Sequence, residues 1–100
     1  MTKLKIKTTI QSELDIIEIG KYIGQYNKIA AKSILNKIRS MFLTLADYPE
    51  LGKNRSEFTD DNNIYFFAFQ SRYLIVYTIN QEELLILRVL SSYQNICKIL

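Results

Sequence analysis

Between residues 9 and 90 the spacing of hydrophobic residues changes once, and no other feature constrains the fold as strongly. From residue 9 to residue 47, apolar side chains recur every three or four positions, which is the repeat of an amphipathic helix. From residue 64 to residue 90 they alternate, and β-branched and aromatic types dominate, which indicates strands. Helices and strands are therefore segregated along the chain, and this order predicts an α+β domain.

A strand and a helical hairpin are expected in the first half of the chain. Lysine and apolar residues alternate from Lys3 to Lys7, so this strand has a charged outer face suited to the edge of a sheet. A first helix is expected from about Thr9 to Tyr26, and a second from Lys28 to about Asp47. Asn27 can end the first helix and cap the second, and so short a connection predicts an antiparallel hairpin.

A meander of three strands is expected in the second half. The segment Tyr48-Pro49-Glu50-Leu51-Gly52 ends the helices, because Pro49 cannot continue one and Gly52 allows a positive φ angle. Three strands follow a polar loop, at residues 64–70, 73–79 and 84–90. Short turns join them into an antiparallel meander, and a short helix is expected from Tyr93 to Leu100. The expected whole is a four-stranded antiparallel sheet with the hairpin on one face.

Composition restricts the chemistry of the chain. Its 100 residues suit one domain, spanning residues 1–100. Histidine is absent and Cys97 is the single cysteine, so we expect no zinc site, no Cys/His nucleophile, no metal and no cofactor. One cysteine excludes an internal disulfide, and no apolar run is long enough for a signal peptide or a membrane span. These features predict a cytoplasmic protein without a membrane partner.

Six short motifs occur along the chain in a fairly specific order and spacing. They are Asp15-Ile16 with Ile19, Tyr22-Ile23, Ala30-Ala31, Tyr48-Pro49-Glu50-Leu51-Gly52 with Arg55, Arg72-Tyr73-Leu74-Ile75-Val76-Tyr77, and Ile86-Leu87-Arg88-Val89-Leu90. Together they resemble the RelE/ParE superfamily of bacterial toxins, and they are most similar to its ParE branch. The resemblance covers roughly residues 4–90 and implies the same fold that the residue pattern predicts.

The resemblance implies the toxin of a type II toxin–antitoxin system, with a cognate antitoxin as its partner. ParE-type toxins poison DNA gyrase without chemistry by their own residues, so gyrase is the expected target and no catalytic residue is expected. RelE-type toxins instead cleave messenger RNA at the ribosome, and this enzymatic function is the alternative. RelE-like enzymes typically place an arginine where this chain has Leu74. The long hairpin and the Pro49–Gly52 turn favour the ParE branch.

One segment departs from the family pattern. Family members often end the last strand with His-Gly-x-Arg-Asp, whereas this chain reads Ser91-Ser92-Tyr93-Gln94-Asn95. The imidazole and basic groups are absent here. A third alternative is therefore a degenerate copy that binds its antitoxin and is not toxic.

Four residues are candidates for contact with the target or with a phosphate: Arg55, Arg72, Arg88 and Tyr93. The two arginines in loops have an equally simple interpretation as solvated surface charges. Arg88 is different, because it lies in an apolar strand, where alternation places it on one face with Ile86 and Leu90. A partly buried guanidinium needs a partner, and the sequence does not identify the carboxylate.

Six further residues are candidates for antitoxin binding: Ile10, Leu14, Ile17, Lys28, Lys32 and Arg39. The three apolar ones form a second apolar face on the first helix. This face either docks an antitoxin helix or a second toxin copy, or packs under the C-terminal segment or against the sheet. The three basic ones lie on one side of the second helix and either meet an acidic antitoxin or DNA, or are solvated. Tyr22 and Tyr26 fit the core spacing, so no sequence-specific DNA binding by the toxin alone is expected.

Overall fold

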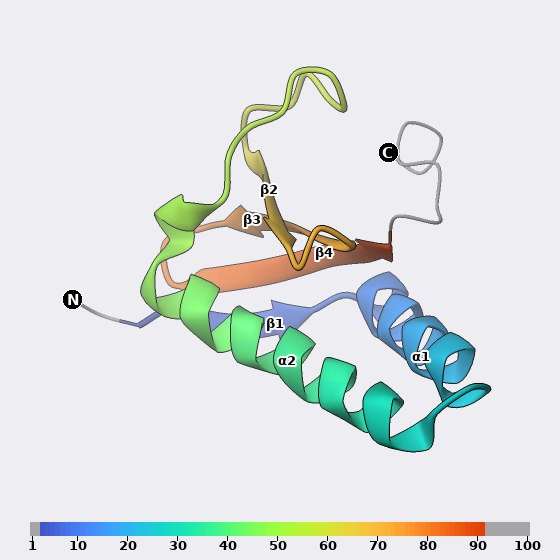
Figure 1. The fold of residues 1–100 in the computed structure, drawn as a ribbon. Helices are drawn as coiled ribbons and strands as arrows, with labels where there is room; N and C mark the ends of the chain where they lie inside the picture. Colours follow the sequence, from blue (N-terminus) through green and yellow to red (C-terminus); the bar gives the residue numbers. More distant parts are fainter. Residues whose placement is uncertain (1–2, 92–100) are drawn as a thin grey trace.

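A computed structural model describes residues 3–91 of the chain, and Figure 1 shows its fold. The elements are β1 (Lys5–Thr8), α1 (Ile10–Gly24), α2 (Lys28–Asp47), the short 3-10 helix η1 (Pro49–Leu51), β2 (Ile64–Phe69), β3 (Tyr73–Ile79) and β4 (Glu83–Ser91). Their limits match those expected from the sequence to within two residues, and those of α2 and β3 coincide with them. The expected helix from Tyr93 to Leu100 lies outside the described residues. Among the described helices, none is long and apolar enough to cross a membrane.

The caps of the two helices explain why the hairpin forms where it does. The Thr9 hydroxyl accepts a hydrogen bond from the backbone N–H of Ser12 at 3.0 Å, which caps α1. The Asn27 side chain accepts one from the N–H of Ala30 at 3.0 Å, so Asn27 caps α2 as expected. Between the helices, a Cβ atom on Gly20 would lie 3.0 Å from Leu35, so the glycine permits close packing of the pair.

The sheet is mixed, which corrects the expectation of an all-antiparallel sheet. Its strand order is β1-β4-β3-β2, and the three C-terminal strands form the expected antiparallel meander. β1 lies at one edge, as expected, but runs parallel to β4. An alternating pattern is the same in either chain direction, so it does not encode strand direction. The long connection through both helices decides that direction here.

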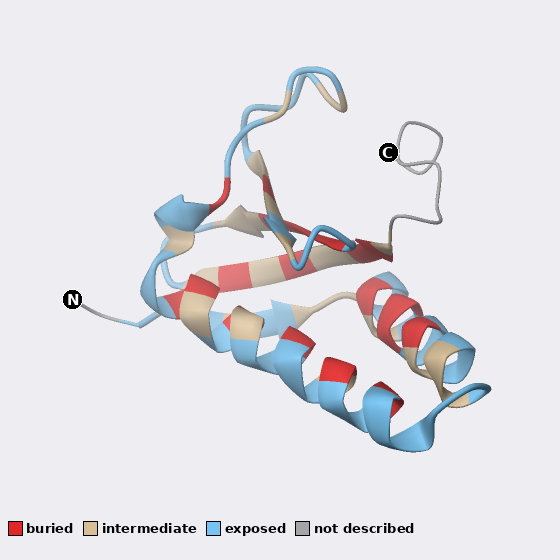
Figure 2. Ribbon diagram, viewed as in Figure 1, coloured by how far each residue is buried: buried red, intermediate tan, exposed pale blue. Residues whose placement is uncertain are grey.

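The main core lies between the helical hairpin and one face of the sheet. Figure 2 shows that the buried residues of both helices face the strands, while their outer faces are exposed. Ile38 and Leu45 of α2 meet Ile75 and Ile86 of the sheet there, and all four are fully buried. Burying one such side chain contributes roughly 1.5–3 kcal/mol. A smaller cluster around Phe66 and Leu90 covers the other face, and Phe58 of the long loop packs on it.

A buried tyrosine holds the turn that follows α2. The Tyr77 hydroxyl donates to the carbonyl oxygen of Pro49 at 2.6 Å and accepts from the N–H of Gly52 at 2.8 Å. Burial raises the pKa of Tyr77 to about 12. Gly52 does not use the positive φ angle that glycine allows, because its φ is −78°. Glycine is needed instead because a Cβ atom would lie 2.1 Å from the tyrosine hydroxyl oxygen.

Candidate functional site

An ion pair fastens α1 to the end of β4. The Arg88 guanidinium donates to the Asp15 carboxylate twice, from Nε at 2.7 Å and from Nη2 at 2.9 Å. The backbone N–H of Val89 donates to the same carboxylate at 3.0 Å. Asp15 is only 6% exposed, so these bonds replace the water that it loses on folding. Asp15 is therefore the carboxylate partner that the sequence did not identify, and Arg88 is engaged inside the fold rather than presented to a target.

A β-bulge explains why alternation misplaced Arg88. Val76 pairs with Arg88, but Tyr77 pairs with Ile86, so Leu87 is an extra residue in β4. An extra residue reverses the alternation that follows it. The expected grouping of Ile86, Arg88 and Leu90 on one face is therefore wrong. Ile86 belongs to the core under the helices, whereas Leu90 belongs to the cluster on the opposite face.

The edge of β4 beyond β1 is completed by α1 rather than by another strand. The backbone N–H of Thr9 donates to the carbonyl of Ile86 at 3.1 Å, and its hydroxyl donates to the carbonyl of Leu87 at 2.9 Å. Further along the same edge of β4, the backbone N–H of Val89 donates to the Asp15 carboxylate. Buried backbone groups at an open edge need such partners. The start of α1 and the end of β4 are thus fixed to each other.

Within residues 3–91, the apolar face of α1 is exposed rather than packed against the sheet. Ile10 is 83% exposed, Leu14 is 49% exposed and Ile17 is 50% exposed. No described segment covers these three side chains. We call Ile10, Leu14 and Ile17 the α1 stripe. Monomeric proteins seldom expose apolar side chains in a contiguous row, so the α1 stripe is a candidate contact surface.

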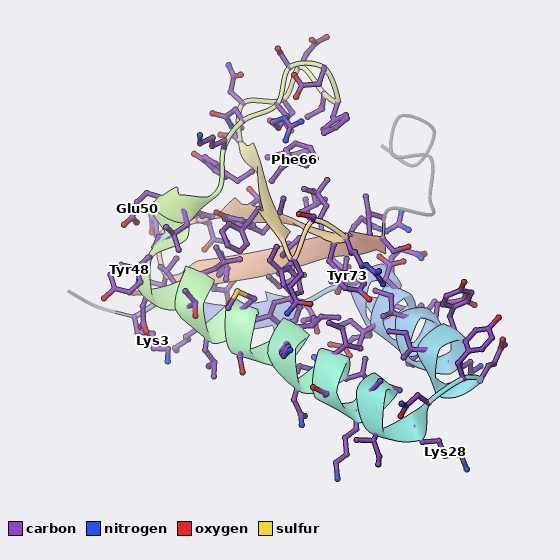
Figure 3. The ribbon with its side chains drawn as sticks, viewed as in Figure 1. Lys3, Lys28, Tyr48, Glu50, Phe66 and Tyr73 are labelled. Atoms are coloured by element: carbon purple, nitrogen blue, oxygen red, sulfur yellow. The ribbon has the colours of Figure 1, made fainter. Side chains whose placement is uncertain are left out.

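The hairpin is basic from the end of α1 through most of α2, whereas the first part of α1 carries Glu13, Asp15 and Glu18. From Ile19 to Ala46 there is no acidic residue, and five basic ones occur: Lys21, Lys28, Lys32, Lys37 and Arg39. Lys28 lies at the tip of the hairpin (Figure 3). Within residues 3–91, only Arg39 of the five forms an ion pair, donating to Glu13 of α1 at 2.8 and 3.1 Å. This hydrogen bonding lowers the pKa of Glu13 to about 2. Arg39 therefore links the two helices, while the lysines give α2 and the end of α1 a positive surface.

Two tyrosines expected in the core lie at the surface. Tyr22 and Tyr26 are both exposed, with ring centroids 5.8 Å apart in an edge-on arrangement. Tyr26 lies beyond the last residue of α1, so helical spacing no longer applies to it. Tyr22 lies on the flank of α1, next to the buried face that contains Ile19, and its side chain is therefore exposed.

Two of the four target-contact candidates share one depression. Arg55, Phe58 and Arg72 line a hollow of about 200 Å³ on the face of the sheet away from the helices. Arg55 pairs with Glu57, and its guanidinium lies 4.8 Å from the centre of the Phe58 ring. Arg72 follows a turn in which two non-glycine residues, Gln70 and Ser71, have φ angles of 55°. Tyr93 lies outside the described residues.

Comparisons with known proteins agree with this fold. A family model described as "ParE toxin of type II toxin-antitoxin system, parDE" matches residues 6–96. A structure described as "Chromosomal ParDE TA system from P. aeruginosa" matches with a TM-score of 0.73 at 15% identity, covering 89% of this chain and 96% of that one. A conserved hypothetical protein from Helicobacter pylori, solved in solution, matches with a TM-score of 0.53 at 13% identity, covering 91% and 97%. The search of curated proteins found no match.

Proposed function

The chain belongs to the family of ParE toxins of type II toxin–antitoxin systems, and we propose that it poisons DNA gyrase in the cytoplasm until a cognate antitoxin neutralises it. The observation that carries this proposal is the family match, which extends over nearly the whole chain. A gyrase poison acts by contact, so no acid–base or metal step is assigned to its residues. Arg55 and Arg72 are the proposed contact cations, because they line one depression at the surface.

The α1 stripe is the proposed docking surface for an antitoxin helix. Its residues follow the spacing i, i+4, i+7, so they point to one side over two helical turns. Burying an exposed Ile or Leu side chain releases roughly 1.5–3 kcal/mol, and partial exposure leaves part of that available for each of the three. The stripe alone offers far less than the roughly 800 Å² per partner of a standard interface, so the antitoxin must cover further surface. The lysines of α2 favour an acidic partner over that helix.

Gyrase poisoning can be tested with relaxed plasmid, ATP and purified gyrase. Refolded toxin should block supercoiling and accumulate linear DNA with gyrase covalently attached, and added antitoxin should restore supercoiling. Unchanged supercoiling, at toxin concentrations that still bind the antitoxin, would remove gyrase as the target. Cleavage of messenger RNA on translating ribosomes would then support the RelE-like alternative. Absence of both effects would identify a copy that binds antitoxin without being toxic.

A single substitution tests the docking surface. Leu14→Lys places a charge in the middle of the α1 stripe and should weaken antitoxin binding at least ten-fold, measured by biolayer interferometry. The matched control is Leu51→Lys, because Leu51 is exposed to a similar degree (44% against 49%) and lies in η1 instead. Far-UV circular dichroism should show both variants folded. Equal antitoxin affinity for the two variants would exclude the stripe as the docking surface.

A further inference from the structure

The tip of the helical hairpin combines exposed aromatic rings with exposed lysines. Tyr22 is 49% exposed and Tyr26 is 76% exposed, and every residue from 25 to 30 is exposed. Lys28 is the first residue of α2, and Figure 3 shows it projecting from the end of the hairpin. We give one name, the tip cluster, to five exposed residues of this region: Lys21, Tyr22, Tyr26, Lys28 and Lys32.

The positive charge of the tip cluster is not neutralised within the fold. Its three lysines form no ion pair with any residue in the 3–91 range. The nearest acid along the chain is Glu18, one helical turn before Tyr22, and the next is Asp47 at the far end of α2. Three lysines against the one carboxylate of Glu18 leave a net charge of +2 between residues 18 and 32. This surface therefore favours a polyanion.

The two rings narrow the choice of polyanion. Their centroids are 5.8 Å apart and their planes are inclined by 69°, so they meet edge to face. In this geometry neither ring covers both faces of the other. Unpaired bases stack on such exposed faces, whereas the carboxylates of an acidic protein use only the cations. Cations together with aromatic faces are the combination that binds a single-stranded nucleic acid.

The structure also removes an objection that the sequence raised. Helical spacing predicted both tyrosines in the core, which would leave the lysines without aromatic neighbours. The structure instead places both rings at the surface, in the same segment as the lysines. A membrane surface fits this segment less well, because Gln25 and Asn27 flank Tyr26 and the tip has no continuous apolar face.

We infer that the tip cluster binds a single-stranded nucleic acid, with its lysines on successive phosphates and an unpaired base stacked on Tyr26. Binding is independent of base sequence, because every nucleotide has a phosphate and every base has a π-face. The inference rests neither on gyrase nor on the antitoxin. It also involves a different surface from the α1 stripe, since the two sets share no residue.

The salt dependence of binding tests the lysine contacts. The probes are fluorescein-labelled oligothymidylate and oligouridylate of about 12 nucleotides, titrated with the full-length toxin and followed by fluorescence anisotropy. Three phosphate contacts predict a slope of about −2 for the logarithm of the binding constant against that of the salt concentration. Such a slope with either probe supports the inference, and the probe that is bound more tightly identifies DNA or RNA as the source of the strand.

Paired substitutions show which lysines are responsible for that slope. Lys28→Gln combined with Lys32→Gln should reduce the slope to about −0.7, the value for one remaining contact. The control combines Lys5→Gln with Lys53→Gln, which removes the same net charge at two exposed lysines outside the hairpin. Its slope should stay at about −2.

Substitution of Tyr26 tests the stacked base. Tyr26→Ala should weaken binding at least about five-fold, which corresponds to the low end for a base stacked on an aromatic ring. Tyr26→Phe keeps the ring and should bind within about two-fold of the wild-type toxin. The control is Tyr48→Ala, because Tyr48 is 53% exposed and lies at the opposite end of α2 (Figure 3). Far-UV circular dichroism should show all these variants folded.

Four results would overturn the inference. The first two are a flat salt response and equal losses for Tyr26→Ala and Tyr48→Ala. The third is binding to vesicles of phosphatidylserine and phosphatidylcholine without binding of either oligonucleotide, which would assign the tip cluster to a membrane. The fourth is loss of antitoxin affinity in the Lys28 and Lys32 double variant, again without oligonucleotide binding by the wild-type toxin, which would assign the tip cluster to the antitoxin. Each of these results leaves gyrase poisoning as it stands, so failure of the inference and failure of the proposed function are distinguishable.

Discussion

The Asp15–Arg88 ion pair should be strongly coupled energetically, and a double-mutant cycle can measure this. Asp15→Ala leaves the guanidinium and the backbone N–H of Val89 without their shared acceptor. Breaking a buried pair costs about 3–5 kcal/mol. The Arg88 side chain is 19% exposed, so we expect the lower end, about 3 kcal/mol. A domain of this size is stable by only about 5–15 kcal/mol, so the loss is readily measured.

The cycle uses Asp15→Ala, Arg88→Met and the combined variant. Each single change should cost about 3 kcal/mol, because each leaves one charge buried and unpaired. The double variant removes both charges, and so it should cost no more than either single one, giving a coupling of about 3 kcal/mol. Urea unfolding followed by far-UV circular dichroism measures all three values, provided that the denaturant slope stays constant.

A second ion pair with the same two-bond geometry provides the control. Glu13 of α1 and Arg39 of α2 are also joined by two hydrogen bonds. Their side chains, however, are 37% and 50% exposed. The cycle built from Glu13→Ala and Arg39→Met should give a coupling below about 1 kcal/mol. If the Asp15–Arg88 double variant instead loses the sum of the two single losses, the pair does not hold α1 to β4 as argued.

Three further changes follow from the same contacts. Gly52→Ala should cost at least about 2 kcal/mol in urea unfolding, because its Cβ would displace the Tyr77 hydroxyl and its two hydrogen bonds; a neutral result would contradict the tether. The pKa of Tyr77 is raised from 10 to about 12, so its contribution to stability is complete below pH 10 and is lost as pH rises through 12. A titration followed by tyrosinate absorbance should show one residue that ionises last. The variant Tyr77→Phe should lack this last ionisation step. The pKa of Glu13 is lowered from 4.5 to about 2, so its contribution to stability is complete above pH 4.5 and is lost as pH falls towards 2. Exposure should keep this contribution below about 1 kcal/mol. The variant Glu13→Gln should remove the fall in the urea midpoint between pH 4.5 and 2 that Glu13 causes.

The sequence predicted the elements well because their signal is local. Each helix repeats its apolar spacing over several turns, and each cap acts within three residues, as Asn27 does on Ala30. The family motifs are also read directly from the chain, and the family match confirms that resemblance. The outer face of α1 was recognised as apolar for the same reason. Whether it was covered depended on the rest of the fold.

The candidate site was predicted less completely. Asp15 stood next to the apolar face of its helix, and that unusual position was the available signal for a buried partner. Alternation wrongly grouped Ile86 with Arg88 and Leu90, because a bulge of one residue is invisible in a short apolar run. The spacing that placed Tyr22 and Tyr26 in the core could not show where α1 ends or which flank the sheet covers.

The sequence alone determined which segments are helices and strands, their limits to within two residues, and the family to which the chain belongs. The tertiary structure decided the direction of β1, the partner of Arg88 and the exposure of the α1 stripe. The physical reason is how far apart in the sequence the interacting residues are. Periodic burial is summed over neighbours a few positions apart, whereas Asp15 and Arg88 are 73 positions apart and meet only after the sheet and the hairpin have assembled.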